Sequence, residues 1–298
     1  MSTTVLVAGA TGNLGSEIVT ELVARGADVR ALVRPSRSDG GDRLRELVAA
    51  DAITLVVGDV NDDLATLTER LRGVDVVVSA LQGGPDVIID GQKNLIRAAE
   101  AAGVTRMIPS DFSVDLHRLE FGDNVFLDMR KTADAAFEHS AVRPTSVLIG
   151  AFMEVLLAPF MGIVDLEGGT FSYWGEGEQP MDFTSIPDAA AYAAVAALDD
   201  STADTTVSFA GEVVTMKQLH AAVVSATGRE LEIRELGTVE ELRAEIERRK
   251  AVANTPFDYV GLQYQWAMVS GKGKLRDLRN ADYPDITPVS IGEFLARR

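Results

Sequence analysis

Short apolar runs alternate with amphipathic segments through the first half of the chain. The runs lie at Val5–Ala8, Val29–Val33, Ile53–Val57, Val74–Val78, Arg106–Ile108 and Ser146–Ile149. Helix-like segments stand between them at 42–50, 63–71, 90–102 and 126–139. Strands that are apolar almost throughout are buried on both faces, and their alternation with helices is typical of repeated βα units. The pattern therefore predicts an α/β fold with a doubly wound parallel sheet, whose ligands bind at the carboxyl ends of its strands.

A glycine-rich turn interrupts the first apolar run, and an amphipathic segment follows it. Gly9 suits a tight turn, Gly12 lets backbone N–H groups approach a pyrophosphate, and Gly15 allows the helix to lie close to its strand. The phosphates would then sit at the positive end of a helix. This context predicts a Rossmann dinucleotide site, against the alternative of an ordinary turn in an α/β protein that binds no nucleotide. The predicted contacts are Gly9, Thr11, Gly12, Asn13, Leu14 and Gly15.

The end of the second strand indicates which nucleotide is bound. Folds that prefer NAD usually place an acidic residue there, whereas NADP folds place arginine near the 2′-phosphate. In this chain Arg34, Ser36 and Arg37 follow the strand, and no carboxylate appears before Asp39. Two guanidinium groups and a hydroxyl suit a phosphate, so we predict NADP(H). The alternative is a solvated basic loop.

Further cofactor contacts are expected after the third and fourth strands. Asp59 would receive the adenine edge, and the segment 79–82 would line the pyrophosphate and the nicotinamide ribose. That segment consists of Ser79, Ala80, Leu81 and Gln82. Asp59 and Gln82 are equally compatible with ordinary polar loop positions.

Neighbours of the nicotinamide are expected after strands five and six. Phe112 and Phe152 would flank the ring or the substrate, because both follow strands at the carboxyl edge of the sheet. Ser110 would donate a hydrogen bond that Asp111 orients. The alternative for Ser110 and Asp111 is that both cap the following turn.

Composition sets broader limits. A chain of 298 residues is large for one core and suggests a main domain with a smaller lobe. The absence of cysteine excludes a disulfide framework, a thiolate nucleophile and a Cys-based zinc site, and three dispersed histidines suggest no metal site. A net charge of −17 argues against nucleic acid as a ligand. The sequence shows neither a leader pattern nor the ~20 apolar residues of a membrane span, so we expect a cytoplasmic protein.

Several motifs in a shared order resemble the NmrA-like and isoflavone reductase group of atypical short-chain dehydrogenases, which includes the phenylcoumaran benzylic ether reductases. The glycine-rich turn and Leu32-Val33-Arg34-Pro35 come first, followed by Gln92 and Ala102-Gly103-Val104. Pro109-Ser110-Asp111-Phe112 is similar to the group's Pro-Ser-Glu-Phe, with Asp111 in place of the glutamate. Trp174-Gly175-Glu176-Gly177, Asp188-Ala189-Ala190-Ala191-Tyr192 and Tyr283-Pro284-Asp285-Ile286 follow, then Glu293-Phe294-Leu295. The resemblance runs nearly end to end.

The resemblance implies an NADPH-binding Rossmann domain and a smaller C-terminal substrate lobe. We expect the first over 1–152, with 182–210 returning to it as a short strand and an alanine-rich helix. The substrate lobe would comprise 153–181 and 211–298. Its densest aromatic stretch, 257–268, is compatible with a strand bulged at Gly261 or with a helix.

The catalytic group is harder to assign. No tyrosine lies between Val5 and Ala151, which argues against the Tyr-x-x-x-Lys mechanism of ordinary short-chain dehydrogenases. The resemblance implies a lysine near the start of the helix before strand six, and two alignments place either Arg130 or Lys131 there. Helical geometry puts Arg130 at the margin of the apolar face and Lys131 nearly opposite. Arginine stays protonated, so it would polarise a carbonyl rather than act as a general acid.

Two functions follow from these observations. The first is an NADPH-dependent reductase that transfers hydride to an aromatic or quinone-like small molecule. The second is a redox-sensing regulator similar to NmrA, which binds NADP(H) and a protein partner without catalysis. We expect a small aromatic substrate as the partner of the enzyme, no nucleic acid or membrane, and a monomer or homodimer.

Overall fold

The computed structural model describes residues 2–34, 44, 46–49 and 52–297. The predicted contacts Ser36 and Arg37, and much of the helix expected over 42–50, lie outside the described residues. The chain forms two compact units, each assembled from separate chain segments. Unit 1 comprises Met1–Phe112, Met129–Val147 and Ala189–Val207, and unit 2 comprises Ser113–Asp128, Leu148–Asp188 and Ser208–Arg298.

The described part of unit 1 is built on a seven-stranded sheet in the order β11-β6-β5-β4-β1-β2-β3. The strands are β1 (Thr4–Ala8), β2 (Asp28–Val33), β3 (Ile53–Val57), β4 (Val76–Ser79), β5 (Arg106–Ile108), β6 (Arg143–Leu148) and β11 (Thr205–Ser208). Neighbouring strands from β3 to β6 are parallel, and Val5 of β1 lies between Val29 of β2 and Val76 of β4. This order confirms the doubly wound parallel sheet.

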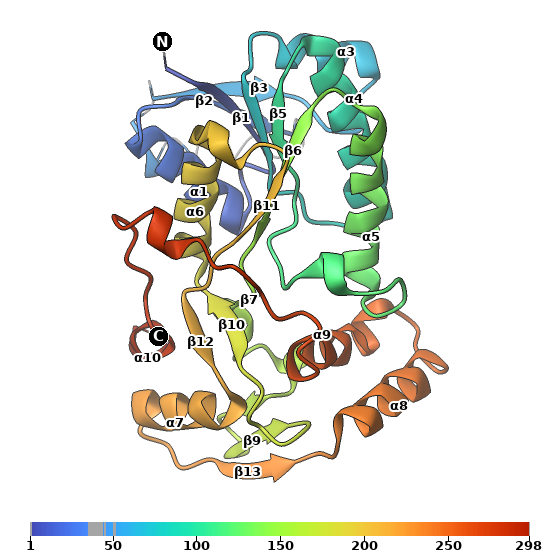
Figure 1. Cartoon of the computed structure of the whole chain (residues 1–298), viewed down its shortest axis with the longest axis vertical. Helices are drawn as coiled ribbons and strands as arrows, with labels where there is room; N and C mark the ends of the chain where they lie inside the picture. Colours follow the sequence, from blue (N-terminus) through green and yellow to red (C-terminus); the bar gives the residue numbers. More distant parts are fainter. Residues whose placement is uncertain (1, 35–43, 45, 50–51, 298) are drawn as a thin grey trace. The chain divides into compact units, whose positions relative to one another are not determined.

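Helices cover both faces of this sheet. Figure 1 shows α1 and α6 against one face and α3, α4 and α5 against the other. Their bounds are α1 (Asn13–Ala24), α3 (Leu64–Leu71), α4 (Gln92–Ala102), α5 (Val125–Asp134) and α6 (Ile186–Leu198). A π-helical turn at Asp86–Gly91 precedes α4, and a 3-10 turn at Ala135–His139 continues α5. The helices expected over 63–71, 90–102 and 126–139 are therefore present.

The core of unit 1 joins the strands to α4. Leu6 of β1, Val77 of β4, Met107 of β5 and Leu95 of α4 are fully buried in one cluster. Burial of each such side chain contributes about 1.5–3 kcal/mol, so the cluster fixes the strands to one another. The loops at the carboxyl ends of β1, β4 and β5 therefore start from defined positions.

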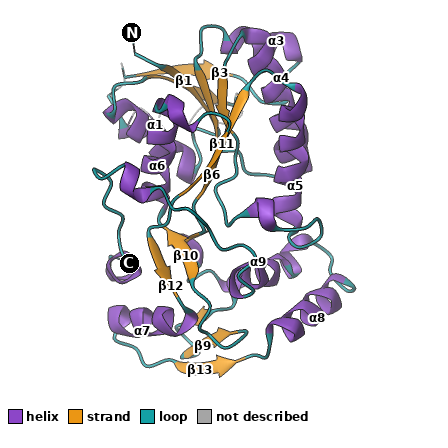
Figure 2. Ribbon diagram, viewed as in Figure 1, coloured by secondary structure: helices purple, strands orange, loops and turns teal. Residues whose placement is uncertain are grey.

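Unit 2 contains short strands and several helices (Figure 2). One three-stranded sheet has the order β12-β10-β7 and another the order β13-β9-β8. The strands are β7 (Ala151–Phe152), β8 (Val164–Asp165), β9 (Thr170–Tyr173), β10 (Met181–Thr184), β12 (Glu212–Val214) and β13 (Glu232–Glu235). The helices are α7 (Met216–Thr227), α8 (Val239–Lys250), α9 (Val260–Val269) and α10 (Ile291–Ala296). Short 3-10 turns in the chain lie at Leu116–Arg118, Met153–Val155, Pro159–Met161, Asp200–Thr202, Pro256–Asp258 and Asn280–Asp282.

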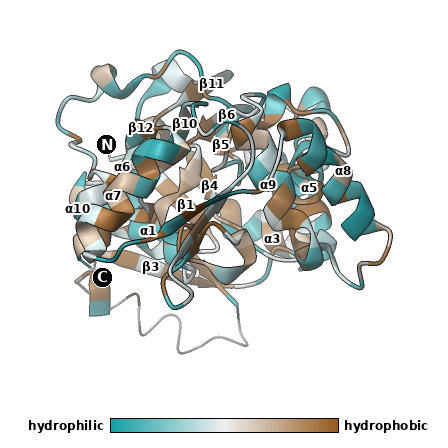
Figure 3. Ribbon diagram, turned by 90° about the horizontal axis from the view of Figure 1, so that it is seen from below, coloured by the Kyte–Doolittle hydropathy of each residue, from teal (hydrophilic) through white to brown (hydrophobic). Residues whose placement is uncertain are grey.

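The helices of unit 2 differ in polarity. α8 is mostly hydrophilic, as its colouring in Figure 3 shows, and buries only Leu242 and Ile246. α9 buries residues on all sides, including Leu262 and Trp266. This explains why the stretch 257–268 gave an ambiguous pattern: a helix buried all round shows no single apolar stripe. Among the described residues, no helix combines the length and apolar composition needed to cross a membrane.

The short strand expected to return to the main sheet forms but pairs elsewhere. β10 pairs with β7 and β12 in unit 2, and β11 takes the place beside β6 in the main sheet. The carboxylate of Asp182 in β10 accepts a hydrogen bond from the backbone N–H of Leu275 at 2.8 Å and pairs with Lys274. These contacts anchor β10 to a C-terminal segment of unit 2.

Candidate functional site

Backbone contacts explain two of the three glycines in the turn between β1 and α1. Gly9 has a φ of +79°, and a Cβ there would lie 2.5 Å from the carbonyl oxygen of Ala80. A Cβ on Gly15 would lie 2.1 Å from the carbonyl oxygen of Gly9. Side chains at either position would push apart the β1–α1 turn or its contact with the residue after β4. Gly9 and Gly15 thus let strand and helix approach each other closely.

Gly12 stands in a different environment at the start of α1. It is exposed, and a Cβ there would meet only the carbonyl oxygen of Gly9, at 3.3 Å. It is the N-cap of α1, and no side chain among the described residues caps that end of the helix. The first turn also contains no acidic residue. Open space at an uncapped helix N-terminus suits a phosphate group, so the residues present fit the predicted dinucleotide.

Three other predicted contacts in this turn have different exposure. Asn13 is exposed, whereas Thr11 and Leu14 are half-buried. All three lie at or next to the first turn of α1, where backbone N–H groups lack helical partners.

The ends of β2 and β3 carry Arg34 and Asp59. Arg34 follows β2 directly and is exposed, as a side chain that binds a ligand phosphate should be. Asp59 is half-buried, and its Oδ1 atom accepts a hydrogen bond from the backbone N–H of Asn61 at 2.9 Å. Its own N–H donates to Asp62 at 2.9 Å. Asp59 therefore shapes the turn after β3, and its contact with the adenine stays a prediction.

The segment after β4 is mostly committed to contacts within unit 1. The buried hydroxyl of Ser79 donates a hydrogen bond to Oε1 of Gln92 at 2.7 Å. Ala80 donates its N–H to the carbonyl oxygen of Ala8 at 2.8 Å. Leu81 is buried, whereas Gln82 is exposed. Only Gln82, of these four, presents an exposed side chain.

Ser110 and Asp111 do not form the pair expected after β5. Ser110 donates its hydroxyl to the carbonyl oxygen of Leu81 at 2.9 Å, and Asp111 accepts from the hydroxyl of Ser146 at 2.7 Å. Both predicted residues are buried, and Ser110 joins the ends of β4 and β5. The expectation that Asp111 orients Ser110 was wrong, because Ser146 of β6 occupies one oxygen of the carboxylate.

Phe112 and Phe152 belong to different units. Phe112 ends the first segment of unit 1 and is buried. Phe152 lies in β7 of unit 2, where it is half-buried and stands opposite Thr184 of β10. Their predicted contact with the nicotinamide or the substrate stays a prediction.

A small cavity of about 10 Å³ lies between β5, α4 and α5. It has room for about one water molecule. Its described lining residues are Ile88, Gln92, Ser110, Asp111, Arg130, Ala133 and Asp134. Arg130 thus lines the same small cavity as Asp111, while Lys131 is half-buried and is not among the residues that line it.

Asp134 is a residue that the sequence interpretation missed. Burial raises the pKa of its carboxyl group well above the ordinary value, and the neighbouring charge of Asp111 raises it further, while Arg130 opposes the shift. One turn of helix separates Arg130 from Asp134, which was the available signal. The partner Asp111, however, lies far away in sequence.

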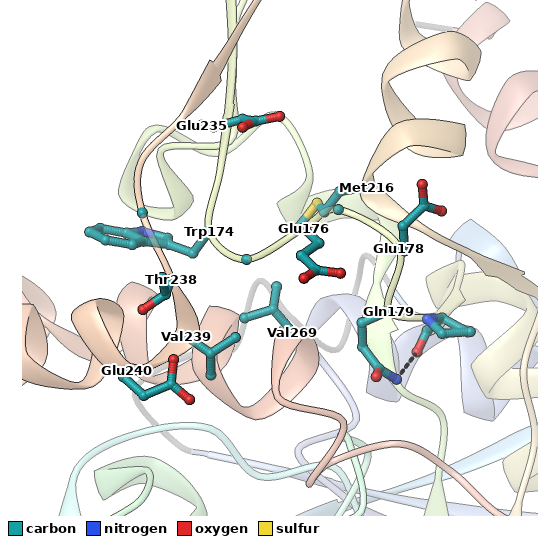
Figure 4. Close-up of a pocket in the computed structure, with 14 residues that line it drawn as sticks. Trp174, Glu176, Glu178, Gln179, Met216, Glu235, Thr238, Val239, Glu240 and Val269 are labelled. Carbon is teal, nitrogen blue, oxygen red and sulfur yellow. Dashed lines mark hydrogen bonds between the residues drawn. The ribbon is translucent and has the colours of Figure 1, made fainter.

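A separate pocket of about 810 Å³ lies within unit 2. Figure 4 shows side chains around it, among them Trp174, Glu176, Glu178, Glu235 and Glu240. Lys217 pairs with Glu178 at 2.7 Å, and the hydroxyl of Tyr173 donates to Glu235 at 3.0 Å. Several carboxylates disfavour an apolar aromatic ligand, whose pockets are predominantly hydrophobic. No predicted site residue is among the described residues that line this pocket.

Comparison with known proteins gives the family. Residues 1–272 match the model of the NmrA-like family. The chain belongs to the NmrA-like family. This confirms the resemblance inferred from the glycine-rich turn and the later motifs.

A sequence relative and two solved structures are similar to this NmrA-like protein over nearly its whole length. It is 25% identical over 307 residues to the probable pinoresinol-lariciresinol reductase 3 of Arabidopsis thaliana, covering 98% of this chain and 96% of that protein. A solved structure of AtPrR2 with NADP+ and (+)pinoresinol has a TM-score of 0.85 at 24% identity, covering 100% and 99%. The binary complex of leucoanthocyanidin reductase with NADPH from Vitis vinifera has a TM-score of 0.81 at 19% identity, covering 99% and 98%. Both solved structures share the fold of this chain.

Proposed function

We propose that this protein is an NADPH-dependent reductase that transfers hydride to an aromatic or quinone-like small molecule. The observation that carries the proposal is the open space at Gly12 beside the uncapped start of α1. The end-to-end similarity to a probable pinoresinol-lariciresinol reductase supports a reductase of aromatic compounds.

We expect the cofactor to bind along the carboxyl edge of the main sheet. The turn from Gly9 to Gly15 would hold the pyrophosphate, and Arg34 with Ser36 and Arg37 would hold the 2′-phosphate. Gln82 is exposed after β4 and suits a contact with the ribose. When bound, NADPH would supply the hydride, and the protein would bind and orient the two reactants.

The remaining roles belong to side chains around the nicotinamide. Arg130 would stabilise negative charge on the acceptor, since its guanidinium is charged at any accessible pH. Lys131 is the alternative cation, and would also be able to donate a proton. Phe112 and Phe152 would contact the ring or the substrate. The segments 153–181 and 211–298 would supply the substrate-binding residues.

The proposal also covers the setting of the reaction. We place the enzyme in the cytoplasm as a monomer or homodimer that binds no nucleic acid. The net charge of −17 supports the absence of nucleic-acid binding, because it repels phosphate backbones. Sedimentation at working concentrations measures the oligomeric state.

The test is an NADPH-oxidation screen against quinones, isoflavones and lignan-type aromatics. We expect turnover with one of these classes, and none with the Gly12→Val variant, which should not bind the cofactor. If no acceptor oxidises NADPH, and NADP+ and NADPH produce different conformations, the redox-sensing regulator replaces the reductase. A sensor requires that difference, because ligands that favour the same state equally do not switch it.

A further inference from the structure

Four buried polar atoms meet around the small cavity of unit 1 without a hydrogen-bond partner among the described residues. They are Nε2 of Gln92, NH1 of Arg130, Oδ1 of Asp111 and Oδ2 of Asp134. Asp111 is 1% exposed and Gln92 is 3% exposed. A buried polar atom without a partner destabilises the folded state, so four in one place indicate groups that the side chains alone do not supply.

The two oxygen atoms are hydrogen-bond acceptors and require a donor. Asp111 and Asp134 lie within hydrogen-bonding reach of each other, but two ionised carboxylates repel and neither donates. The other oxygen of Asp111 already accepts from Ser146. One proton held between the two carboxyl groups turns the repulsion into a hydrogen bond and satisfies both orphaned oxygens. The raised pKa of Asp134, caused first by burial and then by Asp111, agrees with this arrangement.

The two nitrogen atoms require an acceptor. Nε2 of Gln92 and NH1 of Arg130 are both donors, and a water molecule accepts two hydrogen bonds. The cavity of about 10 Å³ has room for about one water molecule. One shared proton and one water molecule therefore give each of the four atoms a partner.

The charges of the cluster also balance with one proton. Arg130 contributes one positive charge, and the singly protonated pair of Asp111 and Asp134 contributes one negative charge. Buried charges are tolerated when they are paired, so this state is favoured over two free carboxylates.

We propose that Asp111 and Asp134 hold one proton between them and that this carboxyl pair is the internal acid of the reaction. The inference rests on the proposed reductase function. Addition of hydride to the acceptor carbon leaves an electron pair on the acceptor oxygen. The O–H bond of the carboxyl pair breaks, the proton passes through the cavity water to that oxygen, and the pair becomes two carboxylates. Arg130 stabilises the extra negative charge until a proton from solvent restores the pair.

The position of the cluster suits this role. Asp111 lies three residues after the end of β5, and ligands of doubly wound sheets bind at the carboxyl ends of the strands. A carboxylic acid whose pKa is raised by burial is suited to proton donation, as in other enzymes that raise carboxyl pKa values. Such an acid also removes the need for a lysine at this point.

Infrared spectroscopy of the whole protein without nucleotide tests the shared proton directly. At neutral pH we expect the carbonyl-stretch band of a protonated carboxyl group, its loss in Asp134→Asn and in Asp111→Asn, and its retention in the exposed control Glu138→Gln. The band should fade as pH rises. Asparagine is a neutral isostere of a protonated aspartate, so Asp134→Asn should fold, and Asp111→Asn provides a second variant. No band at neutral pH, or a band that survives in both variants, would overturn the proposal.

Kinetics with a reducible acceptor test the acid role. The kcat of the unaltered protein should fall over the pH range in which the band fades. Asp134→Asn should lower kcat roughly 10²–10⁴-fold, with NADPH affinity unchanged and the pH dependence lost. If NADPH reduces an acceptor equally fast in Asp134→Asn, the acid role is wrong and the reductase stands. If no acceptor is reduced, the proposed function fails and the acid role with it, whatever the band shows.

Discussion

The guanidinium of Arg106, in β5, donates a hydrogen bond of 3.0 Å to the backbone carbonyl oxygen of Ala196 near the end of α6. Arg106 is only 2% exposed, and it also donates to the hydroxyl of Thr202 at 2.8 Å. Its charge lies near the C-terminal end of a helix, where carbonyl groups lack helical donors and favour cations. Arg106 of β5 thus binds the C-terminal end of α6, at a residue ninety positions later in the sequence.

Replacement of Arg106 by leucine should destabilise the protein. The change removes buried hydrogen bonds from the guanidinium to the carbonyl oxygen of Ala196 and to the hydroxyl of Thr202. A hydrogen bond that involves a charged group contributes about 1.5–3 kcal/mol. Urea unfolding measures the loss. The matched control is Asp200→Asn, since Asp200 pairs with Arg106 but its side chain is 92% exposed. We expect a change within about 0.5 kcal/mol there. Equal stability of Arg106→Leu and the parent would contradict the structural role.

Two glycine substitutions should separate binding from folding. Gly12→Val places a side chain in the open space at the start of α1, so NADPH binding should be lost at a stability cost of about 1 kcal/mol. Gly15→Ala should instead destabilise the fold by about 1–3 kcal/mol, because its Cβ would meet the carbonyl oxygen of Gly9. Calorimetry and thermal unfolding measure the two effects. Unchanged NADPH affinity in Gly12→Val would show that this turn does not hold phosphate.

Arg34 should determine the choice of cofactor. We expect NADPH to bind more tightly than NADH, and Arg34→Ala to narrow the difference by about 1–3 kcal/mol, the scale of a charge-assisted hydrogen bond. Arg72→Ala serves as the control, since Arg72 is also exposed but lies after α3 and pairs with Glu69 at 2.8 Å. Calorimetric titration with both nucleotides measures the difference in binding free energy between NADPH and NADH. Equal affinities in the parent protein would rule out the assignment.

The stability of the protein should depend on pH through Asp134. Its pKa in the folded protein is raised above the ordinary value of 3.8. Between these two values the folded state binds more protons than the unfolded state, so the free energy of unfolding falls as pH rises through that window. Asp134→Asn should remove this decline, and Glu138→Gln should preserve it. Denaturant titrations across the pH range measure the slopes, and parallel slopes for all three proteins would refute the assignment.

Arg130 and Lys131 should differ in their effects on turnover. Arg130 lines the cavity with Asp111 and Asp134, so Arg130→Ala should lower kcat and raise the pKa of the carboxyl pair. Lys131→Ala should change kcat little, because the carboxyl pair supplies the proton. Steady-state kinetics with the acceptor from the screen decide between them. A loss of roughly 10²–10⁴-fold in Lys131→Ala would restore the lysine as general acid.

The sequence predicted those features whose cause is local. Apolar runs such as Val5–Ala8 predicted buried strands because a strand covered on both faces needs almost no polar residue. Gly9 and Gly15 were also identified from a local cause, because the close approach of backbone segments excludes a Cβ at either position. The order of the motifs along the chain was then enough to recognise the family.

Features that depend on contacts between distant segments were not predictable. Ser79 looked like a ribose contact, but its hydroxyl binds Gln92, thirteen residues away. The pairing of Asp111 with Asp134 requires β5 and α5 to be placed side by side, and no spacing in the chain reveals it. Strands as short as Ala151–Phe152 carry too few residues to show a periodicity.

The place of β11 beside β6 has a consequence for biosynthesis. A ribosome delivers β1 to β6 first, then the segment Leu148–Asp188, and only afterwards the strand Thr205–Ser208. During that interval one edge of β6 presents unpaired backbone groups, which readily recruit a strand from another chain. Aggregation of nascent chains should therefore be greatest when synthesis pauses between residues 148 and 205, and should decline once β11 has emerged.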